Sequence, residues 1–333
     1  MSKAFSWNST LVQKRTPIRQ HSVSKCRRAT KQKSGVRCDT SSPSRMIMFP
    51  TSSSPAVHSL AATNETFAAL VALQERVLQI MSDDLSLQPS KHHAPLSLHG
   101  QQEQGQVGDT SKSVVGALLT SWTASDDPKD SKVRWVSASS VANTTMNFGT
   151  TRLMGWVSNQ LRCPHYVLEL GLMGPETVQC SLSLYQRSDL VLDLEYLETF
   201  YDTAVPGLVS SYNEIYNRCL KRQLPSSGGW MHYQVPQCDM KPVLANSISY
   251  TMPAKADDVA DFAACAEDVA RLWTHMLKNS SCDEAKPSSR HQIDAYDARL
   301  VDVVLKDPGN AIAVRMFGED NTKQLLNATV GLF

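Results

Sequence analysis

The stretch that most constrains the fold is residues 164–172, PHYVLELGL, which combine the pattern of a β-strand with a single acid. Successive side chains of a strand point to opposite faces, so Tyr166, Leu168 and Leu170 share one face and Glu169 lies on the other. Both faces are otherwise apolar. A carboxyl in poorly solvated surroundings is harder to ionise, and a neutral carboxyl can deliver a proton to a substrate. Glu169 is therefore the first candidate for chemistry.

The segments around this strand show the same alternation and are separated by polar turns. Strands are expected at 114–122, 133–141, 164–172, 177–185 and 243–252. The connections at 125–130 and 173–176 contain proline or glycine and are too short for the helical crossover that parallel strands need. The strands should therefore pair as antiparallel hairpins.

Apolar residues at helical spacing flank this β-rich region. Helices are expected at 64–82, 193–202, 206–222, 257–279 and 291–305, with a last one after Gly318 that is capped near Asp320 or Asn321. The helix at 257–279 is the clearest, because the acids Asp257 and Asp258 suit its N-terminus and an apolar stripe follows them. The pattern predicts the α+β class, with helices packed on the faces of one antiparallel sheet.

Basic residues are concentrated at the N-terminus. Residues 1–45 hold 11 of the 33 basic residues and one of the 32 acidic residues, so residues 46–333 carry 22 basic against 31 acidic residues. A basic segment rich in serine and threonine, without an apolar core, is typical of an organelle transit peptide. The rival interpretation is a disordered arm that binds nucleic acid, but the acidic remainder argues against a nucleic-acid partner.

This charge pattern divides the chain into a transit peptide at 1–45, a linker rich in serine and proline at 46–62, and a single domain at 63–333. No apolar run approaches the roughly 18 residues of a membrane helix, so no transmembrane segment is expected.

Motifs for bound cofactors and metals are absent from the sequence. There is no G-x-G-x-x-G, no G-x-x-x-x-G-K-[ST] and no C-x-x-C pair. His92, His93 and His99 lie in a polar segment at 87–112 and are interpreted as solvated loop residues rather than as metal ligands. A redox enzyme with these features would bind no cofactor and would take electrons from another protein.

Three stretches together resemble one family, red chlorophyll catabolite reductase of plant and algal chlorophyll breakdown. They are residues 164–201 with PHYVLEL, RSDLVL and EYLETFY, residues 246–250 (NSISY) before the helix at 257–279, and residues 315–319 (RMFGE). The likeness runs from about 67 to 333.

The resemblance implies a fold and an activity. The fold would be a three-layer α/β/α sandwich with a central antiparallel sheet, as in the ferredoxin-dependent bilin reductases. The activity would be reduction of red chlorophyll catabolite, a linear tetrapyrrole, to primary fluorescent chlorophyll catabolite, with reduced ferredoxin as the external electron donor and no bound cofactor. The resemblance also implies a chloroplast protein, in the stroma or peripheral to the thylakoid, that forms a homodimer and has pheophorbide a oxygenase as a partner.

The same resemblance assigns residues. The family's buried strand glutamate falls on Glu169, and its second acid falls on Asp307 after a shift of one residue. Both are expected to donate or relay protons. The remaining candidates are donors to the substrate's propionate and ketone groups, and a relay histidine: Arg187, Ser249, Tyr250, Arg315 and His165. Lys221, Arg222 and Lys323 are candidates for docking acidic ferredoxin.

Each assignment has a structural alternative. Glu169 could pair with an arginine, Asp307 could be a turn acid before Pro308, Arg315 could pair with Glu319, and His165 could be a satisfied strand histidine. At the level of function, the alternatives are a protein that binds a tetrapyrrole without reducing it, and a reductase of another bilin.

Overall fold

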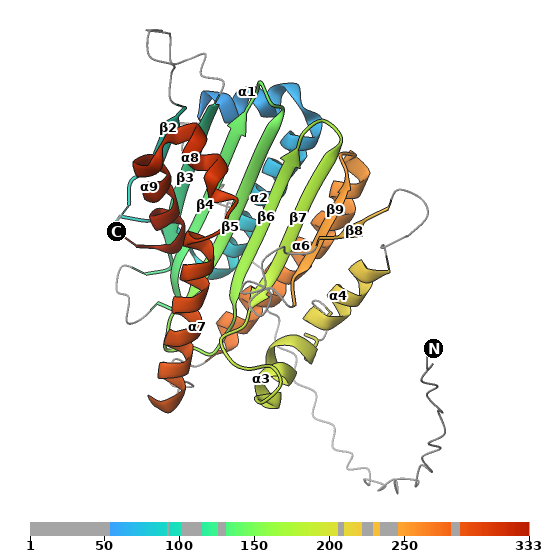
Figure 1. Ribbon diagram of the computed structural model, residues 1–333. Helices are drawn as coiled ribbons and strands as arrows, with labels where there is room; N and C mark the ends of the chain where they lie inside the picture. Colours follow the sequence, from blue (N-terminus) through green and yellow to red (C-terminus); the bar gives the residue numbers. More distant parts are fainter. Residues whose placement is uncertain are drawn as a thin grey trace, which may run out of the picture. The chain divides into compact units, whose positions relative to one another are not determined.

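A nine-stranded antiparallel sheet organises the molecule in the computed structural model (Figure 1). The structure describes residues 54–91, 93–100, 115–125, 131–205, 210–221, 229–233, 246–280 and 287–332. The predicted transit peptide at 1–45 lies outside these ranges. The described residues belong to one compact unit, which the following description concerns.

The strands follow the order β1-β3-β4-β5-β6-β7-β9-β8, and β2 also pairs with β3. Their bounds are β1 (Gln88–Pro89), β2 (Leu96–His99), β3 (Val115–Thr123), β4 (Val133–Asn143), β5 (Phe148–Val157), β6 (His165–Met173), β7 (Thr177–Tyr185), β8 (Met231–His232) and β9 (Ile248–Pro253). Every pairing is antiparallel, so the predicted hairpin architecture is confirmed.

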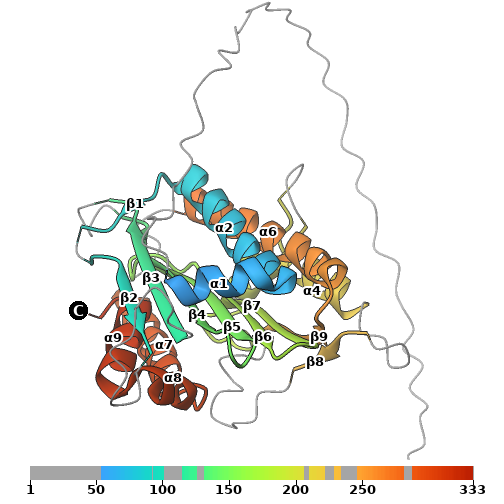
Figure 2. The same cartoon turned by 90° about the horizontal axis from the view of Figure 1, so that it is seen from above.

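Helices cover both faces of the sheet (Figure 2). One face carries α1 (Pro55–Thr63), α2 (Glu65–Leu85), α4 (Tyr212–Leu220) and α6 (Ala256–Asn279). The other face carries α7 (Pro287–Leu305), α8 (Asn310–Phe317) and α9 (Glu319–Val330). Helix α9 contacts β3, β4 and β5, and α7 shares a core cluster with Val167 of β6 and Tyr185 of β7. The short helix α3 (Leu194–Leu197) continues into the π-helical turn η2 (Glu198–Asp202) beyond the end of β7. The predicted three-layer α/β/α sandwich is therefore confirmed.

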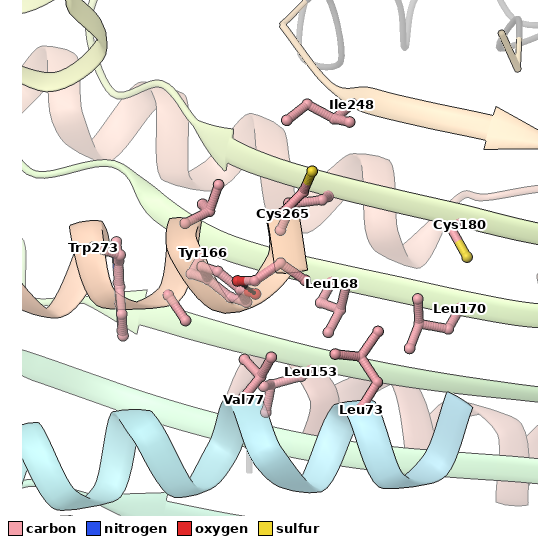
Figure 3. Close-up of a cluster of buried hydrophobic side chains, with 14 of the residues drawn as sticks. Leu73, Val77, Leu153, Tyr166, Leu168, Leu170, Cys180, Ile248, Cys265 and Trp273 are labelled. Carbon is pink, nitrogen blue, oxygen red and sulfur yellow. Dashed lines mark hydrogen bonds between the residues drawn. The ribbon is translucent and has the colours of Figure 1, made fainter. Parts of the chain in front are cut away.

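The main core lies between the sheet and the pair α2 and α6. In Figure 3, Leu73 and Val77 of α2 and Trp273 of α6 approach Tyr166 and Leu168 of β6. Tyr166 and Leu168 show the alternation expected for one face of β6, and all five of these residues are buried. The apolar stripes predicted for the helices at 64–82 and 257–279 are therefore confirmed, because both helices bury these stripes against the sheet.

Two strand glycines let the helices come close to the sheet. A Cβ at Gly155 of β5 would lie 2.6 Å from the ring of Trp273, and one at Gly149 would lie 2.4 Å from the ring of Phe67 in α2. Any side chain at these positions would push an aromatic ring out of the core, so glycine is required for the close helix–sheet packing.

Several elements differ from the prediction. Helix α1 occupies part of the segment 46–62 that we expected to be a linker. It starts with Pro55 in the first turn, where a missing amide N–H costs nothing, and it buries Ala56, Val57 and Leu60. The linker assignment is therefore wrong for residues 55–62, which form most of α1.

The segment 87–112 includes the short strands β1 and β2 as well as residues outside the described ranges. Strand β5 and helix α8 were not predicted. The sequence of β5, FGTTRLMGWV, mixes two glycines and an arginine into a strand and so obscures its alternation.

Candidate functional site

A polar row crosses the sheet on the face opposite α2 and α6. The register places Arg152 of β5 opposite Glu169 of β6, Glu169 opposite Ser181 of β7, and Ser181 opposite Ser249 of β9. Directly paired residues of an antiparallel sheet point to the same side. The four side chains therefore form one continuous line across four neighbouring strands.

Glu169 is held by an ion pair. Its Oε1 lies 2.6 Å from Nε of Arg152, and the two side chains are 36% and 23% exposed respectively. The expectation that Glu169 lies in an apolar slot is wrong, because the acid is partly solvated and has a cationic partner. The paired-arginine alternative describes this geometry.

The backbone beneath the pair is fixed from the other side of the sheet. Gln74, a polar residue among the buried side chains of α2, donates from Nε2 to the carbonyl oxygens of Arg152 (2.8 Å) and Ser139 (3.1 Å). The same side chain accepts from Ser140 Oγ at 3.3 Å. A buried amide with three partners fixes the strand that carries Arg152 without leaving polar atoms unsatisfied.

Asp307 acts on the same arginine, although it follows α7 in the sequence. Burial tends to lower the pKa of Arg152, but Glu169, then Asp307, then Tyr185 outweigh burial and raise that pKa. Burial also raises the pKa of Tyr185, and the charges of Glu169 and Asp307 raise it further. Both predicted acids, one arginine and one tyrosine therefore form a single electrostatic cluster, which we call the Arg152 cluster.

The backbone explains the position of Asp307. Its Oδ1 accepts from the amide N–H of Gly309 at 2.7 Å, and its carbonyl accepts from the N–H of Asn310 at 2.9 Å. These contacts make the tight turn between α7 and α8. The turn-acid alternative therefore describes the contacts of this carboxyl, whose charge also acts on Arg152.

The serines at the other end of the row bond to each other. Ser181 Oγ and Ser249 Oγ are 2.7 Å apart, and Ser181 is only partly buried. Ser249 is thus on the same face as Glu169, as its predicted role in substrate binding requires. Tyr250 is not, because it is the next residue of β9 and points into the main core against Trp230, with ring centroids 5.4 Å apart. The prediction that Tyr250 and Ser249 line one site is corrected.

Arg187 belongs to a separate, buried network. Its guanidinium binds Asp297 of α7 through two parallel contacts of 2.8 Å, and Nη1 donates to the carbonyl oxygens of Ser158 and Leu161, each at 2.9 Å. The side chain of Arg187 has no exposed surface. Its donors are used within the fold, so the predicted role of Arg187 in binding substrate is corrected to a structural role.

His165 completes this network. Its Nδ1 accepts from the amide N–H of Val157 at 3.0 Å, so Nε2 carries the proton and donates to Asp297 at 2.8 Å. Burial lowers the pKa of His165 and keeps the ring neutral. Burial tends to raise the pKa of Asp297, but His165 and Arg187 hold it far below its ordinary value. His165 is therefore a satisfied strand histidine, and its predicted contact with substrate is corrected.

The remaining candidates lie apart from these two networks. Arg315 is exposed in the last turn of α8. Among the described residues, no group of three or more His, Cys, Asp or Glu is arranged to hold a metal ion. His93 packs against Trp135 with ring centroids 6.1 Å apart, His99 is exposed, and His92 lies outside the described ranges.

Sequence reasoning missed Arg152, Tyr185 and Asp297. An arginine inside a strand was a usable signal for Arg152, because such a cation needs an anion on the same sheet face. Asp297 had no such signal, since IDAYDARL reads as an ordinary helix with an exposed acid.

No helix within the described ranges is long and apolar enough to cross a bilayer.

Comparisons with known proteins agree with the sequence resemblance. Residues 108–216 match the family described as "Red chlorophyll catabolite reductase (RCC reductase)". This match spans β3 to β7 and includes Arg152, Glu169 and Ser181. A search of curated protein sequences found no match.

A solved structure shares the fold. It is described as "Crystal structure of SeMet-phytochromobilin synthase from tomato in complex with biliverdin". It aligns with a TM-score of 0.56 and 15% sequence identity over 77% of this chain and 81% of the tomato chain. At this identity the likeness establishes the fold, and the predicted bilin reductase-like architecture is confirmed.

Proposed function

We propose that this chain is a ferredoxin-dependent reductase that converts red chlorophyll catabolite to primary fluorescent chlorophyll catabolite. The family match and the bilin reductase-like fold support a bilin-reducing oxidoreductase. The narrower substrate, product and electron donor are our proposal. The observation that carries it is the polar row from Arg152 through Glu169 and Ser181 to Ser249, in which Glu169 Oε1 lies 2.6 Å from Arg152 Nε. The charge of Asp307 also acts on Arg152.

The reaction determines what the protein has to provide. Reducing a methine bridge of a linear tetrapyrrole takes two electrons and two protons. Reduced ferredoxin supplies electrons singly and no protons. The chain must therefore deliver two protons, and one well-placed acid contributes roughly 10²- to 10⁴-fold in rate.

In our proposal, Glu169 and Asp307 are the groups that hold and move these protons. Glu169 is paired with Arg152 in the structure, and a guanidinium can bind a carboxylate through two parallel hydrogen bonds. A substrate propionate that binds Arg152 would compete with Glu169 for it. Glu169 would then lose its cationic partner and be able to carry a proton to the pigment.

Ser181 and Ser249 would extend the site along the sheet. Their hydroxyls bond to each other at 2.7 Å, and this bond uses the hydrogen of one of them, so the other hydroxyl is left to donate to a ketone or carboxylate of the substrate. On this face α9 contacts β3, β4 and β5, and α7 shares a core cluster with Val167 of β6 and Tyr185 of β7, whereas Ser181 lies further along β7 and is only partly buried.

Ferredoxin docking is proposed to use surface cations. Lys221, at the end of α4, and Lys323, on α9, are both exposed. Arg222 lies outside the described ranges. The homodimer, the chloroplast location and the partnership with pheophorbide a oxygenase remain predictions from the family resemblance.

An anaerobic turnover assay tests the proposal. The purified chain is mixed with red chlorophyll catabolite, ferredoxin and a ferredoxin-reducing system, and product is followed by its blue fluorescence. Fluorescence that requires both chain and ferredoxin is expected. Pigment that binds in a one-to-one ratio without any change in absorbance would instead indicate a tetrapyrrole-binding protein. Turnover of biliverdin alone would indicate a reductase of another bilin.

A further inference from the structure

Two cysteines from different helices meet on the face of the sheet away from the Arg152 cluster. Cys219 is in the last turn of α4, and Cys265 is near the middle of α6. Their sulfurs are 2.9 Å apart. This separation lies between a disulfide bond of about 2.05 Å and ordinary non-bonded contact of about 3.5–4 Å. The two thiols therefore already have the approach that a bond between them requires.

The surroundings favour the thiolate of Cys265. The hydrogen bond from Cys219 is the main influence and lowers the pKa of Cys265; burial acts in the opposite direction, and the charge of Arg218 adds to the lowering. Arg218 Nη2 lies 3.9 Å from Cys265 Sγ and is itself held by Asp268 at 2.7 Å. The thiolate is the nucleophilic form of cysteine, so this arrangement is suited to reaction.

The other described cysteines of the core differ from this pair. Cys180 of β7 is fully buried, and burial raises its pKa far above the ordinary value. Cys163 is also fully buried and contacts the hydroxyl of Ser280 at 2.8 Å. Cys265 retains 5% exposure against 1% for Cys219, which makes Cys265 the one that a small oxidant reaches first.

We propose that Cys219 and Cys265 form a reversible disulfide that joins α4 to α6, with Cys265 as the attacking thiolate and hydrogen peroxide as the oxidant. The thiolate sulfur attacks one peroxide oxygen, the O–O bond breaks, and the departing hydroxide takes up a proton to become water. Cys265 is then a sulfenic acid. The sulfur of Cys219 loses its proton and attacks the Cys265 sulfur, the S–O bond breaks, and a second water leaves. The two thiols lose two electrons, which the peroxide accepts.

The bond would stiffen one edge of the sheet. Helix α4 is tied to the chain just before β9 through Tyr212, whose hydroxyl donates to the carbonyl oxygen of Asn246 at 2.7 Å. Joining α4 to α6 would therefore restrain the edge of the sheet that β9 and β8 form. This inference rests on the two thiols and their surroundings and does not depend on the proposed bilin chemistry.

The test uses the full chain, fully reduced and then freed of reductant. It is exposed to hydrogen peroxide, remaining thiols are blocked with N-ethylmaleimide, and tryptic peptides are analysed by mass spectrometry. We expect a cross-linked pair that contains Cys219 and Cys265 and disappears on adding dithiothreitol. The oxidised chain should melt about 5–10 °C higher, because the bond closes a long loop. Absence of that cross-linked pair, or equal cross-linking of Cys163 or Cys180, would overturn the proposal.

Matched variants test the different roles of the two thiols. In Cys219→Ser the sulfenic acid at Cys265 has no partner and should be trapped by dimedone, whereas Cys265→Ser should give no adduct at Cys219. Cys180→Ala is the control and should cross-link as the parent chain does. Arg218→Gln should slow oxidation several-fold at pH 7 and much less at pH 9.5, where the thiolate forms without help. Equal rates for Arg218→Gln and parent at pH 7 would remove Arg218 from the proposal.

Discussion

Two arginine–carboxylate pairs lie on the same face of one sheet and differ in how completely they are satisfied. Arg187 and Asp297 are buried, and carbonyl oxygens and His165 provide the remaining partners. Arg152 and Glu169 are partly exposed and pair with each other. A closed network fixes the fold, whereas an open pair can exchange partners. Charge pairs of similar chemistry therefore have different roles depending on what surrounds them.

Replacing Glu169 with Gln should have the largest effect on activity. We expect the turnover rate to fall by about 10²- to 10⁴-fold, because a proton donor is lost while the shape is kept. Stability should change by no more than about 1 kcal/mol, since partly exposed ion pairs contribute little. Steady-state kinetics with reduced ferredoxin and chemical denaturation measure the two effects. A rate near that of the parent chain would remove Glu169 from the mechanism.

Replacing Asp297 with Ala should show the opposite pattern. It leaves the Arg187 guanidinium buried without an anion, which costs roughly 3–5 kcal/mol of folding free energy. Urea unfolding measures the loss, and Asp297→Asn is a milder variant if the alanine form does not fold. A loss below 1 kcal/mol would contradict the closed-network description. Any activity that survives in folded protein should keep the parent KM.

Replacing Asp307 with Asn tests whether this acid works together with Glu169 of the open pair. The amide oxygen can still accept from the Gly309 N–H, so the turn should persist while the charge is removed. We expect turnover to drop about 10- to 10³-fold with little change in melting temperature. Combining Asp307→Asn with Glu169→Gln should give less than the product of the single effects, because the two act as one unit. Fully multiplicative effects would indicate that the acids work independently.

Replacing Arg152 with Gln should mainly weaken binding. If Arg152 takes a substrate carboxylate, KM should rise about 10- to 100-fold, as expected for a lost charged hydrogen bond. Arg152→Lys keeps the charge but not the two parallel contacts, so it should recover part of the affinity. An unchanged KM in both variants would limit Arg152 to orienting Glu169.

The pH dependence of stability should report the closed network. The pKa of His165 is lowered in the folded state, so below about pH 6.5 only the unfolded chain gains the proton and stability falls. The slope should approach about 1.4 kcal/mol per pH unit. The lowered pKa of Asp297 adds a second loss below about pH 3.9. His165→Asn should abolish the first phase and reduce the second, which Arg187 alone would then maintain, as followed by urea unfolding from about pH 7.5 to about pH 2.5.

The comparison of the two pairs also shows what sequence could and could not reveal. Periodicity located β6 and the stripes of α2 and α6, because apolar spacing records the faces that are buried. It could not tell that Glu169 faces Arg152, since the pairing of β5 with β6 places a residue 17 positions away beside it. The family resemblance supplied Asp307, but only the folded chain shows that it acts on the same arginine.

A family resemblance does not show which face of a strand each matched residue occupies. Ser249 and Tyr250 are adjacent in sequence, yet the two-residue period of β9 sends Tyr250 into the core and leaves Ser249 beside Ser181. Arg187 looked like a substrate ligand because its anion, Asp297, lies 110 positions further along the chain. Long-range partners of this kind leave no local trace in a single sequence.

The last turn of α9 has a practical consequence for anyone who edits this protein. The indole N–H groups of Trp135 and Trp156 donate to the carbonyl oxygens of Ala328 (2.9 Å) and Thr329 (3.2 Å), and Ser137 Oγ also donates to the latter at 2.8 Å. Three donors on β4 and β5 thus depend on two peptide units close to the chain's end. A truncation before Ala328 would leave these three donors buried without hydrogen-bond acceptors. Purification tags and truncations should therefore leave Ala328 and Thr329 in place.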